Sequence, residues 1–499
     1  MTSADQHAFA TADAATEQER MHYVRPPDWH NPSPASLYDL VVLGAGTAGL
    51  FAAKMAAARG KKVAIVERHL LGGTCLNIGC LPSKTIIRTS RAYGDMRDGA
   101  QFGAEVPHDV TVDFPAAMRR VRRIRARVSQ FDSVRGLEAA GIDTFFGDGR
   151  FVGSDALTVN GATLRFTRAV IATGAHPSTP TIPGLAEAGY ITNENAFELT
   201  EAPRRLLVIG GGPLGCEMAQ AFCRLGVETT IVQNWPLFLP REERDAAQLL
   251  SDAFARDGIR IRLDTNVESV RIDGGETLVD LVHDDYRNTI AVDAILTGVG
   301  RTPNVGDLDL EAAGVAYDDS HGVHVDDFLC TANSRIFAAG DVCLERKFNA
   351  TAEASARIAV ANALFDEHRR LSALIIPWCT YTDPEIAHVG MYVREAREQG
   401  ISVKTFTIPL HEVDRAIADG EEGGFVKIHV RERTDEIIGA TIVATHAGEM
   451  ISEITLAMVA GVGLRTLANV IHPYPTQAEA IRQAAEAYEL SQASSPALE

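Results

Sequence analysis

Two cysteines separated by four residues are the part of this chain best suited to chemistry. Cys75 and Cys80 lie in the run GGTCLNIGCLPSK, residues 72–84. The flanking GGT and PSK favour a loop that leads into a helix, and the amino end of a helix stabilises a thiolate, the reactive form of cysteine. Because the spacing also lets the two sulfurs join as a disulfide, the pair predicts redox chemistry.

A zinc half-site or two buried thiols would be a simpler explanation of this spacing. No second cysteine pair at ligand spacing follows, so a closed four-thiolate zinc site has too few partners. We therefore expect no structural metal, although Cys75 and Cys80 could hold a soft metal ion transiently as a substrate. The remaining cysteines are scattered, at Cys216, Cys223, Cys330, Cys343 and Cys379.

A glycine-rich turn precedes the cysteine pair and predicts the element that positions it. Residues 38–67 form a strand, a turn with Gly44, Gly46 and Gly49, a helix and a second strand that ends at Glu67. Glycines there let the backbone approach a pyrophosphate, whose charge the helix amino end favours, and an acid at Glu67 can accept hydrogen bonds from ribose hydroxyls. This stretch predicts a dinucleotide site.

The same pattern returns over residues 204–234, so the chain contains two dinucleotide-binding units. The glycines of the second turn are Gly210, Gly212 and Gly215. Gln233, followed by Asn234, takes the place that Glu67 has in the first unit. A carboxylate there would repel the 2′-phosphate of NADPH. Because the second unit has no acid at this position, the sequence slightly favours NADPH over NADH.

Three further apolar segments end in glycine turns, over residues 169–177, 294–304 and 335–342, as suits strand ends near a cofactor. After about residue 373 the sequence pattern changes, and apolar and polar residues alternate. This alternation predicts antiparallel strands and a separate α+β domain. The apolar helix within that domain could belong to its core or to a subunit contact.

Composition and charge exclude several classes of protein. The chain has 499 residues, 46% of them hydrophobic, and a net charge of −19, which opposes nucleic-acid or anionic-membrane binding. No apolar run is long enough to span a bilayer. The first residues lack the basic region followed by an apolar core that is typical of a secretory signal peptide. We therefore expect a cytoplasmic enzyme that binds neither nucleic acid nor membrane.

One basic segment opposes the acidic balance, within a helix expected from Pro115 to Ala140. It is either a solvated helix face, which we favour, or a docking surface for an acidic partner. Residues 1–36 are polar and proline-rich at their end, which predicts a mobile arm. The arginines of the basic segment are Arg119, Arg120, Arg122, Arg123, Arg125 and Arg127.

Taken together, GGTCLNIGCLPSK, both glycine turns, FAAGDV and the run HPYPTQAE (472–479) resemble the flavin disulfide reductases, the class I pyridine nucleotide-disulfide oxidoreductases. The resemblance covers nearly everything from Leu37 to Tyr488. It implies FAD in the first unit, NADPH or NADH in the second, and a homodimer. Cys80 would face the flavin and Cys75 the substrate, and Lys84 would pair with Glu217 near the flavin. The FAD residues implied are Gly44, Gly46, Gly49, Glu67, Gly73, Thr74, Lys84, Thr173, Gly174 and Asp341, and those for the nicotinamide nucleotide are Gly210, Gly212, Gly215, Gln233, Asn234 and Gly300.

The predicted fold class is α/β, with two Rossmann-like dinucleotide-binding domains and a C-terminal α+β dimerisation domain. The expected segments are a disordered N-terminal arm (1–36), the FAD domain (37–195, with a return segment 326–373), the NAD(P) domain (196–325), the C-terminal interface domain (374–488) and a tail (489–499).

The chain departs from the disulfide-reducing members at one position. Tyr474 stands where they carry a histidine, Glu479 follows five residues later, and His472 lies two residues upstream. A phenol with an ordinary pKa near 10 is a poor proton shuttle at neutral pH, whereas imidazole titrates in range. Mercuric reductases resemble the chain better there, since they also have a tyrosine, but no cysteine follows Cys379 to match their C-terminal pair.

The predicted function is therefore an FAD-dependent NAD(P)H oxidoreductase that passes electrons through the Cys75–Cys80 disulfide to an acceptor, most reasonably a metal ion. A low-molecular-weight disulfide or dihydrolipoyl-type oxidoreductase, with His472 as the base, is the first alternative. The second is a non-catalytic dimeric subunit of a complex.

Overall fold

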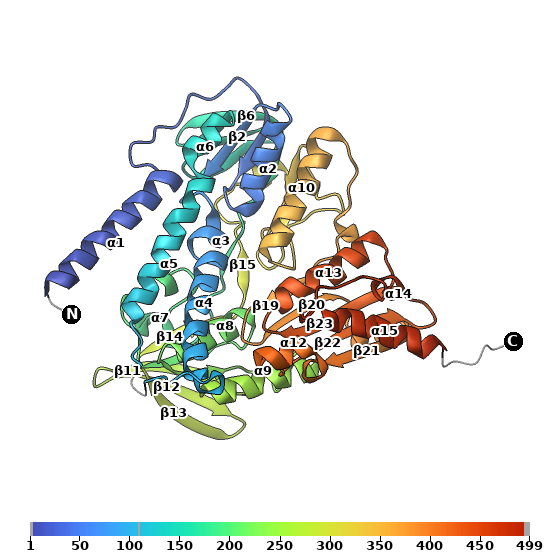
Figure 1. The fold of residues 1–499 in the computed structure, drawn as a ribbon. Coiled ribbons are helices and arrows are strands. Elements are labelled where there is room, and N and C mark those ends of the chain that lie inside the picture. Colours follow the sequence, from blue (N-terminus) through green and yellow to red (C-terminus); the bar gives the residue numbers. More distant parts are fainter. Residues whose placement is uncertain (1–2, 108–109, 494–499) are drawn as a thin grey trace.

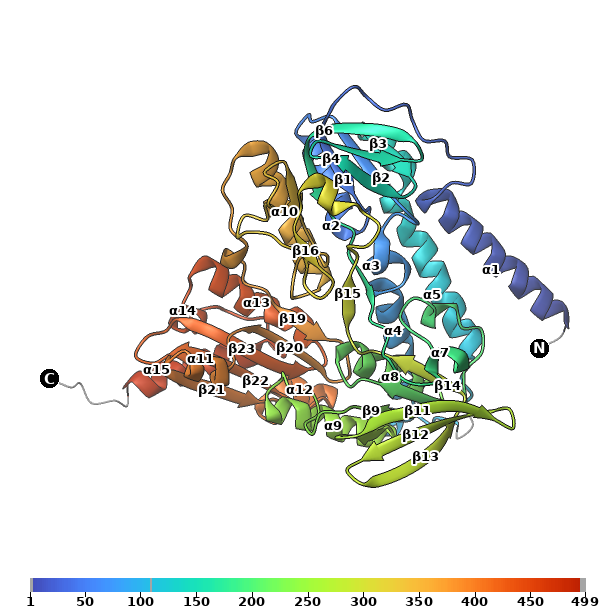
Figure 2. The same ribbon diagram turned by 180° about the vertical axis from the view of Figure 1, so that it is seen from behind.

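The structure is a computed structural model that describes residues 3–107 and 110–493. The largest sheets of this part of the chain have seven, five and four strands. The two βαβ units and the C-terminal domain each carry one of them, which confirms the predicted α/β fold class. The C-terminal sheet lies on the side of the molecule opposite the N-terminal helix (Figure 1, Figure 2).

The seven-stranded sheet is built around β1 (Tyr38–Leu43), in the order β3-β2-β1-β6-β5-β4, with β18 also paired to β6. The apolar run of β1 is largely buried and pairs in parallel with β2 and β6, as expected for a strand covered on both faces. Its other strands are β2 (Val63–Glu67), β3 (Ile142–Phe146), β4 (Gly149–Gly153), β5 (Ala156–Val159), β6 (Ala162–Ile171) and β18 (Ile336–Ala338).

Two alanine-rich helices, α2 (Thr47–Ala58) and α10 (Asn349–Phe365), pack side by side against this sheet (Figure 1). Their buried alanines bring the two backbones close. α10 and β18 both come from residues 326–373, so that segment returns to the first sheet. The numerical bounds of the domains stay predictions.

The four-stranded parallel sheet of the second unit runs in the order β10-β9-β8-β14. α8 (Pro213–Arg224) follows β8 through a turn so tight that a Cβ on Gly215 would lie 1.9 Å from the Gly210 carbonyl oxygen. The strands are β8 (Arg205–Ile209), β9 (Glu228–Val232), β10 (Arg260–Arg262) and β14 (Ala294–Thr297). Helix α9 (Arg244–Asp257) lies between β9 and β10 in the chain, and the antiparallel sheet of β11 (Asn266–Asp273), β12 (Glu276–His283) and β13 (Tyr286–Val292) lies between β10 and β14.

The C-terminal domain is a five-stranded antiparallel sheet in the order β19-β20-β23-β22-β21. Helix α13 (Ala447–Ala460) packs on β20 and β23, and α15 (Glu479–Ala493) on β21 and β22. α13 buries Ile451 and Ile454 in the domain core while Leu456 and Val459 stay exposed, so one face serves the core. The strands are β19 (Trp378–Thr380), β20 (Glu385–Gly390), β21 (Val403–Pro409), β22 (Phe425–Arg431) and β23 (Ile437–Ala444).

The redox region carries four helices, and one prediction about them is wrong. α3 (Gly73–Asn77) and α4 (Cys80–Arg97) follow the first βαβ unit. The helix expected from Pro115 to Ala140 is two helices, α5 (Phe114–Ser129) and α6 (Val134–Ala139). The helix is interrupted before Ser133. The Ser133 hydroxyl accepts the Gly136 N–H at 3.2 Å and caps the second helix.

Most of the segment expected as a mobile arm is helical instead, because α1 (Ser3–Val24) is a helix that lies alongside α5 (Figure 1, Figure 2). Its low apolar content argues only against folding alone, and here α5 supplies the surface it needs. An Arg122 N–H donates to Asp13 at 2.8 Å, and Arg125 lies 3.6 Å from Glu17. The basic segment is therefore in part a docking surface, and the acidic partner is the chain's own helix.

The predicted tail is partly helical, since α15 continues to Ala493, and residues 494–499 lie outside the described residues. None of the described helices combines the length and apolar character that crossing a bilayer requires. The remaining elements are η1 (Gly99–Phe102), η2 (Gln130–Asp132), β7 (Ala175–Pro177), α7 (Leu185–Ala188), η3 (Ala196–Glu198), β15 (Arg301–Pro303), η4 (Leu310–Ala313), β16 (Tyr317–Asp318), β17 (Gly322–Val323), η5 (Leu371–Ala373), α11 (Val393–Glu398), η6 (Leu410–Glu412), α12 (Asp414–Asp419) and α14 (Leu464–Leu467).

The close approach at α8 generates a test with a matched control. Gly215→Ala should cost about 2 to 4 kcal/mol of unfolding free energy, because its methyl group would meet backbone that cannot move aside. Gly212→Ala, where an added Cβ meets nothing within 4 Å, should cost less than about 1 kcal/mol. Urea unfolding of both variants measures the difference, and equal losses would contradict the argument.

Candidate active site

Cys75 and Cys80 lie on opposite sides of one tight turn. Cys75 is in α3, and Cys80 is the first residue of α4. A Cβ on the intervening Gly79 would come within 2.8 Å of the Thr74 carbonyl oxygen, so this turn requires a glycine. Both cysteines are free thiols here, Cys75 half-buried and Cys80 exposed.

The two thiols ionise unequally because they form a hydrogen bond. The Cys75 thiol donates to Cys80, which lowers the pKa of Cys80 to about 7, and the Lys84 ammonium adds to this effect. The same hydrogen bond, with burial, raises the pKa of Cys75 above its usual range. Cys80 is therefore the thiol of the pair that ionises first, and Cys75 is the one that keeps its proton.

Lys84 and Glu217 form the ion pair that the family resemblance implied, at 2.8 Å between the ammonium nitrogen and a carboxylate oxygen. The other oxygen of this buried carboxylate accepts the Tyr381 N–H at 2.9 Å. The Lys84 ammonium also lies 4.5 Å from the centre of the Tyr381 ring. Tyr381, which sequence reasoning missed, thus joins the C-terminal domain to this pair.

The first glycine turn lies against the redox loop. A Cβ on Gly73 would lie 2.6 Å from the Gly46 Cα, so the two turns meet backbone to backbone. At the end of β2, one Glu67 oxygen accepts the Ala45 N–H and the other the His69 N–H, both at 2.7 Å. Each oxygen keeps a second lone pair for a hydroxyl, so these residues fit an FAD ribose and pyrophosphate.

The other residues predicted for FAD gather around β7 and β15. The Thr173 hydroxyl donates to the Asn304 carbonyl at 2.8 Å, and Gly174 has a φ of +71° with open space where a side chain would be. Asp341 lies 3.4 Å from the Arg301 guanidinium, and burial raises the pKa of its carboxyl. This carboxyl fits a polar part of the cofactor.

Sequence reasoning missed Arg301, although it is the one basic residue of the segment 294–304. One of its N–H groups donates to the Ala175 carbonyl at 2.6 Å and lies 3.5 Å from the Thr74 hydroxyl. Its charge also helps to lower the pKa of Cys80. Arg301 therefore links the strand of one predicted site to the redox loop.

In the second unit the residues predicted for the nicotinamide nucleotide lie around the start of α8. Gly210 and Gly300 have φ values of +106° and +120°. The buried Gln233 amide donates to the Leu237 carbonyl at 2.7 Å and so holds its own loop, while Asn234 is exposed. The lean toward NADPH stays a prediction.

Tyr474, His472 and Glu479 lie in the C-terminal domain, in the segment between α14 and α15 and at the start of α15. The Tyr474 side chain is 71% exposed and donates to Asp414 at 2.8 Å, which raises the pKa of the phenol. The His472 side chain is only 5% exposed and contacts Glu453 at 3.0 Å. Glu479 is buried and lies 3.3 Å from Arg482.

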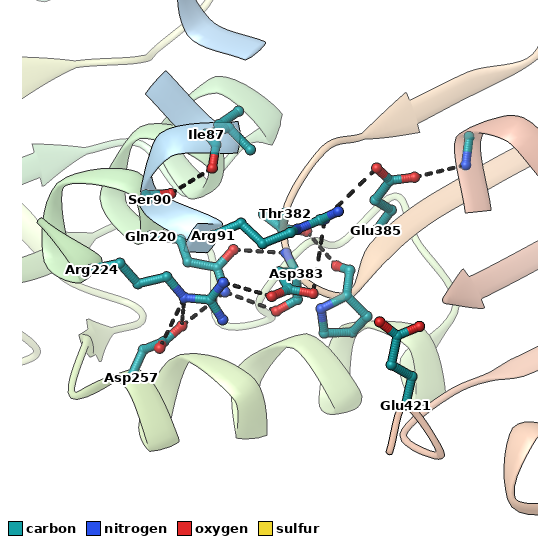
Figure 3. Close-up of polar contacts among 12 residues, drawn as sticks. Ile87, Ser90, Arg91, Gln220, Arg224, Asp257, Thr382, Asp383, Glu385 and Glu421 are labelled. Carbon is teal, nitrogen blue, oxygen red and sulfur yellow. Dashed lines mark hydrogen bonds and ion pairs between the residues drawn. The ribbon is translucent and has the colours of Figure 1, made fainter. Parts of the chain in front are cut away.

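A polar cluster next to the redox helix joins three parts of the chain (Figure 3). Arg91 of α4 lies 3.9 Å from both Asp383 and Glu385, which flank the start of β20. Arg224 of α8 donates to Asp383 at 2.6 Å and to Asp257 at 2.9 Å. Burial raises the pKa of Glu385 to about 7, although the Gly448 N–H and Arg91 oppose it.

Residues 3–107 and 110–493 contain no cluster of three or more histidine, cysteine or acidic side chains arranged to hold a metal ion. The features that the structure does bring together are a thiol pair, an adjacent ion pair and two glycine turns.

The chain is similar to known proteins over most of its length. Residues 38–363 match the family model of the pyridine nucleotide-disulphide oxidoreductases, and residues 376–485 match its dimerisation domain. The chain is 34% identical to a mercuric reductase from Staphylococcus aureus over 90% of its length and 82% of that protein. It is 35% identical to one from Streptomyces lividans (90% and 96%) and 33% identical to a dihydrolipoyl dehydrogenase from Thermus scotoductus (90% and 97%).

Among solved structures, the Cu(II) complex of the HOCl-induced flavoprotein disulfide reductase RclA from Escherichia coli matches with a TM-score of 0.81 at 28% identity, over 91% of this chain and 100% of that one. LpdA from Mycobacterium tuberculosis matches with a TM-score of 0.82 at 27% identity, over 91% and 100%.

Removing the Lys84 ammonium should raise the pKa of Cys80 from about 7 by about one unit, because the cation that favours the thiolate is lost and the Glu217 charge is left facing it. The rate of iodoacetamide reaction with the reduced Lys84→Met protein, followed from pH 5 to 10, measures this shift. Lys54→Met, which removes a lysine that pairs with Asp132, is the control. An unshifted profile in Lys84→Met would contradict the assignment.

Glu385 should make stability fall as pH rises. Its pKa is raised in the folded protein from 4.5 to about 7, so the folded state binds the proton more tightly, and this contribution is full below pH 4.5 and lost through pH 7. The loss is on the order of 3 kcal/mol at most. Glu385→Gln should remove that slope, which urea unfolding at pH 5 and pH 8 can measure. A variant as pH-sensitive as the wild type would refute the expectation.

Proposed function

Because the chain belongs to the pyridine nucleotide-disulphide oxidoreductases, we propose that it reduces a metal ion, as mercuric reductases do, with Cys75 and Cys80 as the ligands of that ion. The family makes the protein an NAD(P)H-dependent flavoprotein oxidoreductase with FAD as its cofactor. When bound, FAD supplies a redox centre that takes a hydride from the nicotinamide and returns an electron pair to the disulfide.

The observation that carries the proposal is the thiol pair. A thiolate that forms near pH 7 beside a second thiol offers two soft sulfur ligands within one turn, and soft ligands select soft cations. The Lys84 ammonium favours the thiolate form of Cys80, which is the form that binds a metal ion.

Tyr474 supports a metal ion over a disulfide as acceptor. Reduction of a disulfide needs a proton for the leaving thiolate, and hydrogen bonding to Asp414 raises the pKa of the phenol, so it holds its proton at neutral pH. Metal reduction makes no such demand, because the ion leaves its sulfur ligands without protonation of a substrate sulfur.

The dimerisation-domain match supports a homodimer. The matched domain exposes several apolar side chains, including Leu456, Val459 and Ile471, the last 95% exposed. In an isologous dimer this surface would be covered, and Tyr474 and Glu479 would complete the cysteine site of the partner subunit.

A disulfide or dihydrolipoyl-type activity is the second candidate, because one relative is named dihydrolipoyl dehydrogenase. His472 does not favour it, since only 5% of this side chain is exposed and it lies against Glu453 of its own domain. The enzyme class removes the support for a non-catalytic subunit. Location in the cytoplasm stays a prediction.

Mercuric or cupric salts should stimulate NADPH or NADH oxidation by the purified flavoprotein. Cys75→Ser should reduce the stimulated rate at least about tenfold, because one of the two soft ligands is lost. Cys330→Ser, which changes a half-buried thiol in another part of the chain, is the control for adventitious metal binding. Equal rates in the wild type and Cys75→Ser would discard the proposal, and faster turnover of lipoamide or glutathione disulfide would replace it with the second candidate.

A further inference from the structure

Helix α1 lies outside both matched regions of the chain, yet its last turns reach the redox loop. The family match begins at residue 38, and α1 ends at Val24. Val24 is fully buried in the core of the first unit, and its carbonyl accepts the Leu71 N–H at 3.2 Å. The helix therefore meets the chain just before the GGT of the cysteine motif.

The contact that connects α1 to the cysteines is made by Arg20. Its side chain extends from the last turns of α1, and the residue is only 7% exposed. One guanidinium N–H donates to the Asn77 side-chain oxygen at 2.6 Å in a buried environment, and the Glu17 carboxylate accepts another at 2.9 Å. The fork geometry of arginine allows both at once.

Asn77 is the residue through which the redox loop is fixed. It lies between Cys75 and Cys80, and its side-chain N–H groups donate to the carbonyls of Leu71 at 2.9 Å and Gly73 at 3.0 Å. Those carbonyls bracket the start of α3, the helix of Cys75. The Asn77 main-chain oxygen accepts an N–H of the buried Arg125, at 3.0 Å, on the side that leads to Cys80.

We propose that Arg20 is a positioning residue for the Cys75–Cys80 pair and that it acts through Asn77. By occupying the amide oxygen of Asn77, the guanidinium fixes which end of that amide faces the loop, so the N–H groups point at Leu71 and Gly73. Without Arg20 the buried oxygen loses its donor, and the amide has no reason to keep this orientation. The inference rests on the proposed redox role of the pair.

The chain offers a control on the same helix. Asp13 holds α1 to Arg122 of α5 but contacts nothing in the cysteine loop. Asp13→Asn therefore weakens the docking of the helix and leaves the Arg20–Asn77 contact in place. Arg20→Met removes the contact and keeps much of the length of the side chain.

The experiment measures amide hydrogen exchange over residues 73–80 and the iodoacetamide rate of the reduced cysteines in the full-length holoenzyme. Arg20→Met should raise exchange in this segment at least about fivefold, since a buried hydrogen bond to a charged group is lost, whereas Asp13→Asn should change it less than about twofold. Asn77→Ala should act as strongly as Arg20→Met, and the double variant should add nothing further.

Three results would overturn the proposal: wild-type exchange in Arg20→Met, equal loosening in Asp13→Asn, or additive effects in the double variant. If Arg20→Met does not fold, Arg20→Lys serves instead, because an ammonium lacks the fork that reaches Glu17 and Asn77 together, and wild-type exchange there would count against the proposal. None of these readouts needs an acceptor, so a failed metal assay leaves this test intact.

Discussion

The buried carboxylate of Glu217 is the point on which the arrangement of the site depends. It comes from α8 of the second unit, pairs with Lys84 of the redox helix and accepts the Tyr381 N–H of the C-terminal domain. A buried charge is costly unless each of its oxygens finds a donor, so the three parts of the chain are held in one relative position. The position of the thiolate next to this ion pair follows from that requirement.

Farther from the cysteines, the same face of α8 makes further contacts with the C-terminal domain. Gln220 and Arg224 follow Glu217 by three and seven residues, the spacing of one helix face, and both contact Asp383 (Figure 3). On α4, Arg91 stands seven residues after Lys84 and reaches Asp383 and Glu385. Two helices thus present polar stripes to one loop of the C-terminal domain, and the redox helix is fixed along its length.

The parts that could be predicted from sequence are those whose signals are local. Each glycine turn is read from a few residues, because Gly44 or Gly210 is needed where two backbone segments meet. The Lys84–Glu217 contact needed the family resemblance, since 133 residues separate the partners. α1 was missed because its stability comes from Arg122 and Asn77, far along the chain, and Arg301 because nothing local marks its contact with Thr74.

Helix α1 shows that the start of the family match and the start of the packed fold are two different positions in the chain. The family match begins at residue 38, whereas the polypeptide that completes the packing begins earlier, with a helix whose Arg20 and Val24 are buried. A segment that the family model leaves unmatched can therefore still supply side chains to the interior of the fold.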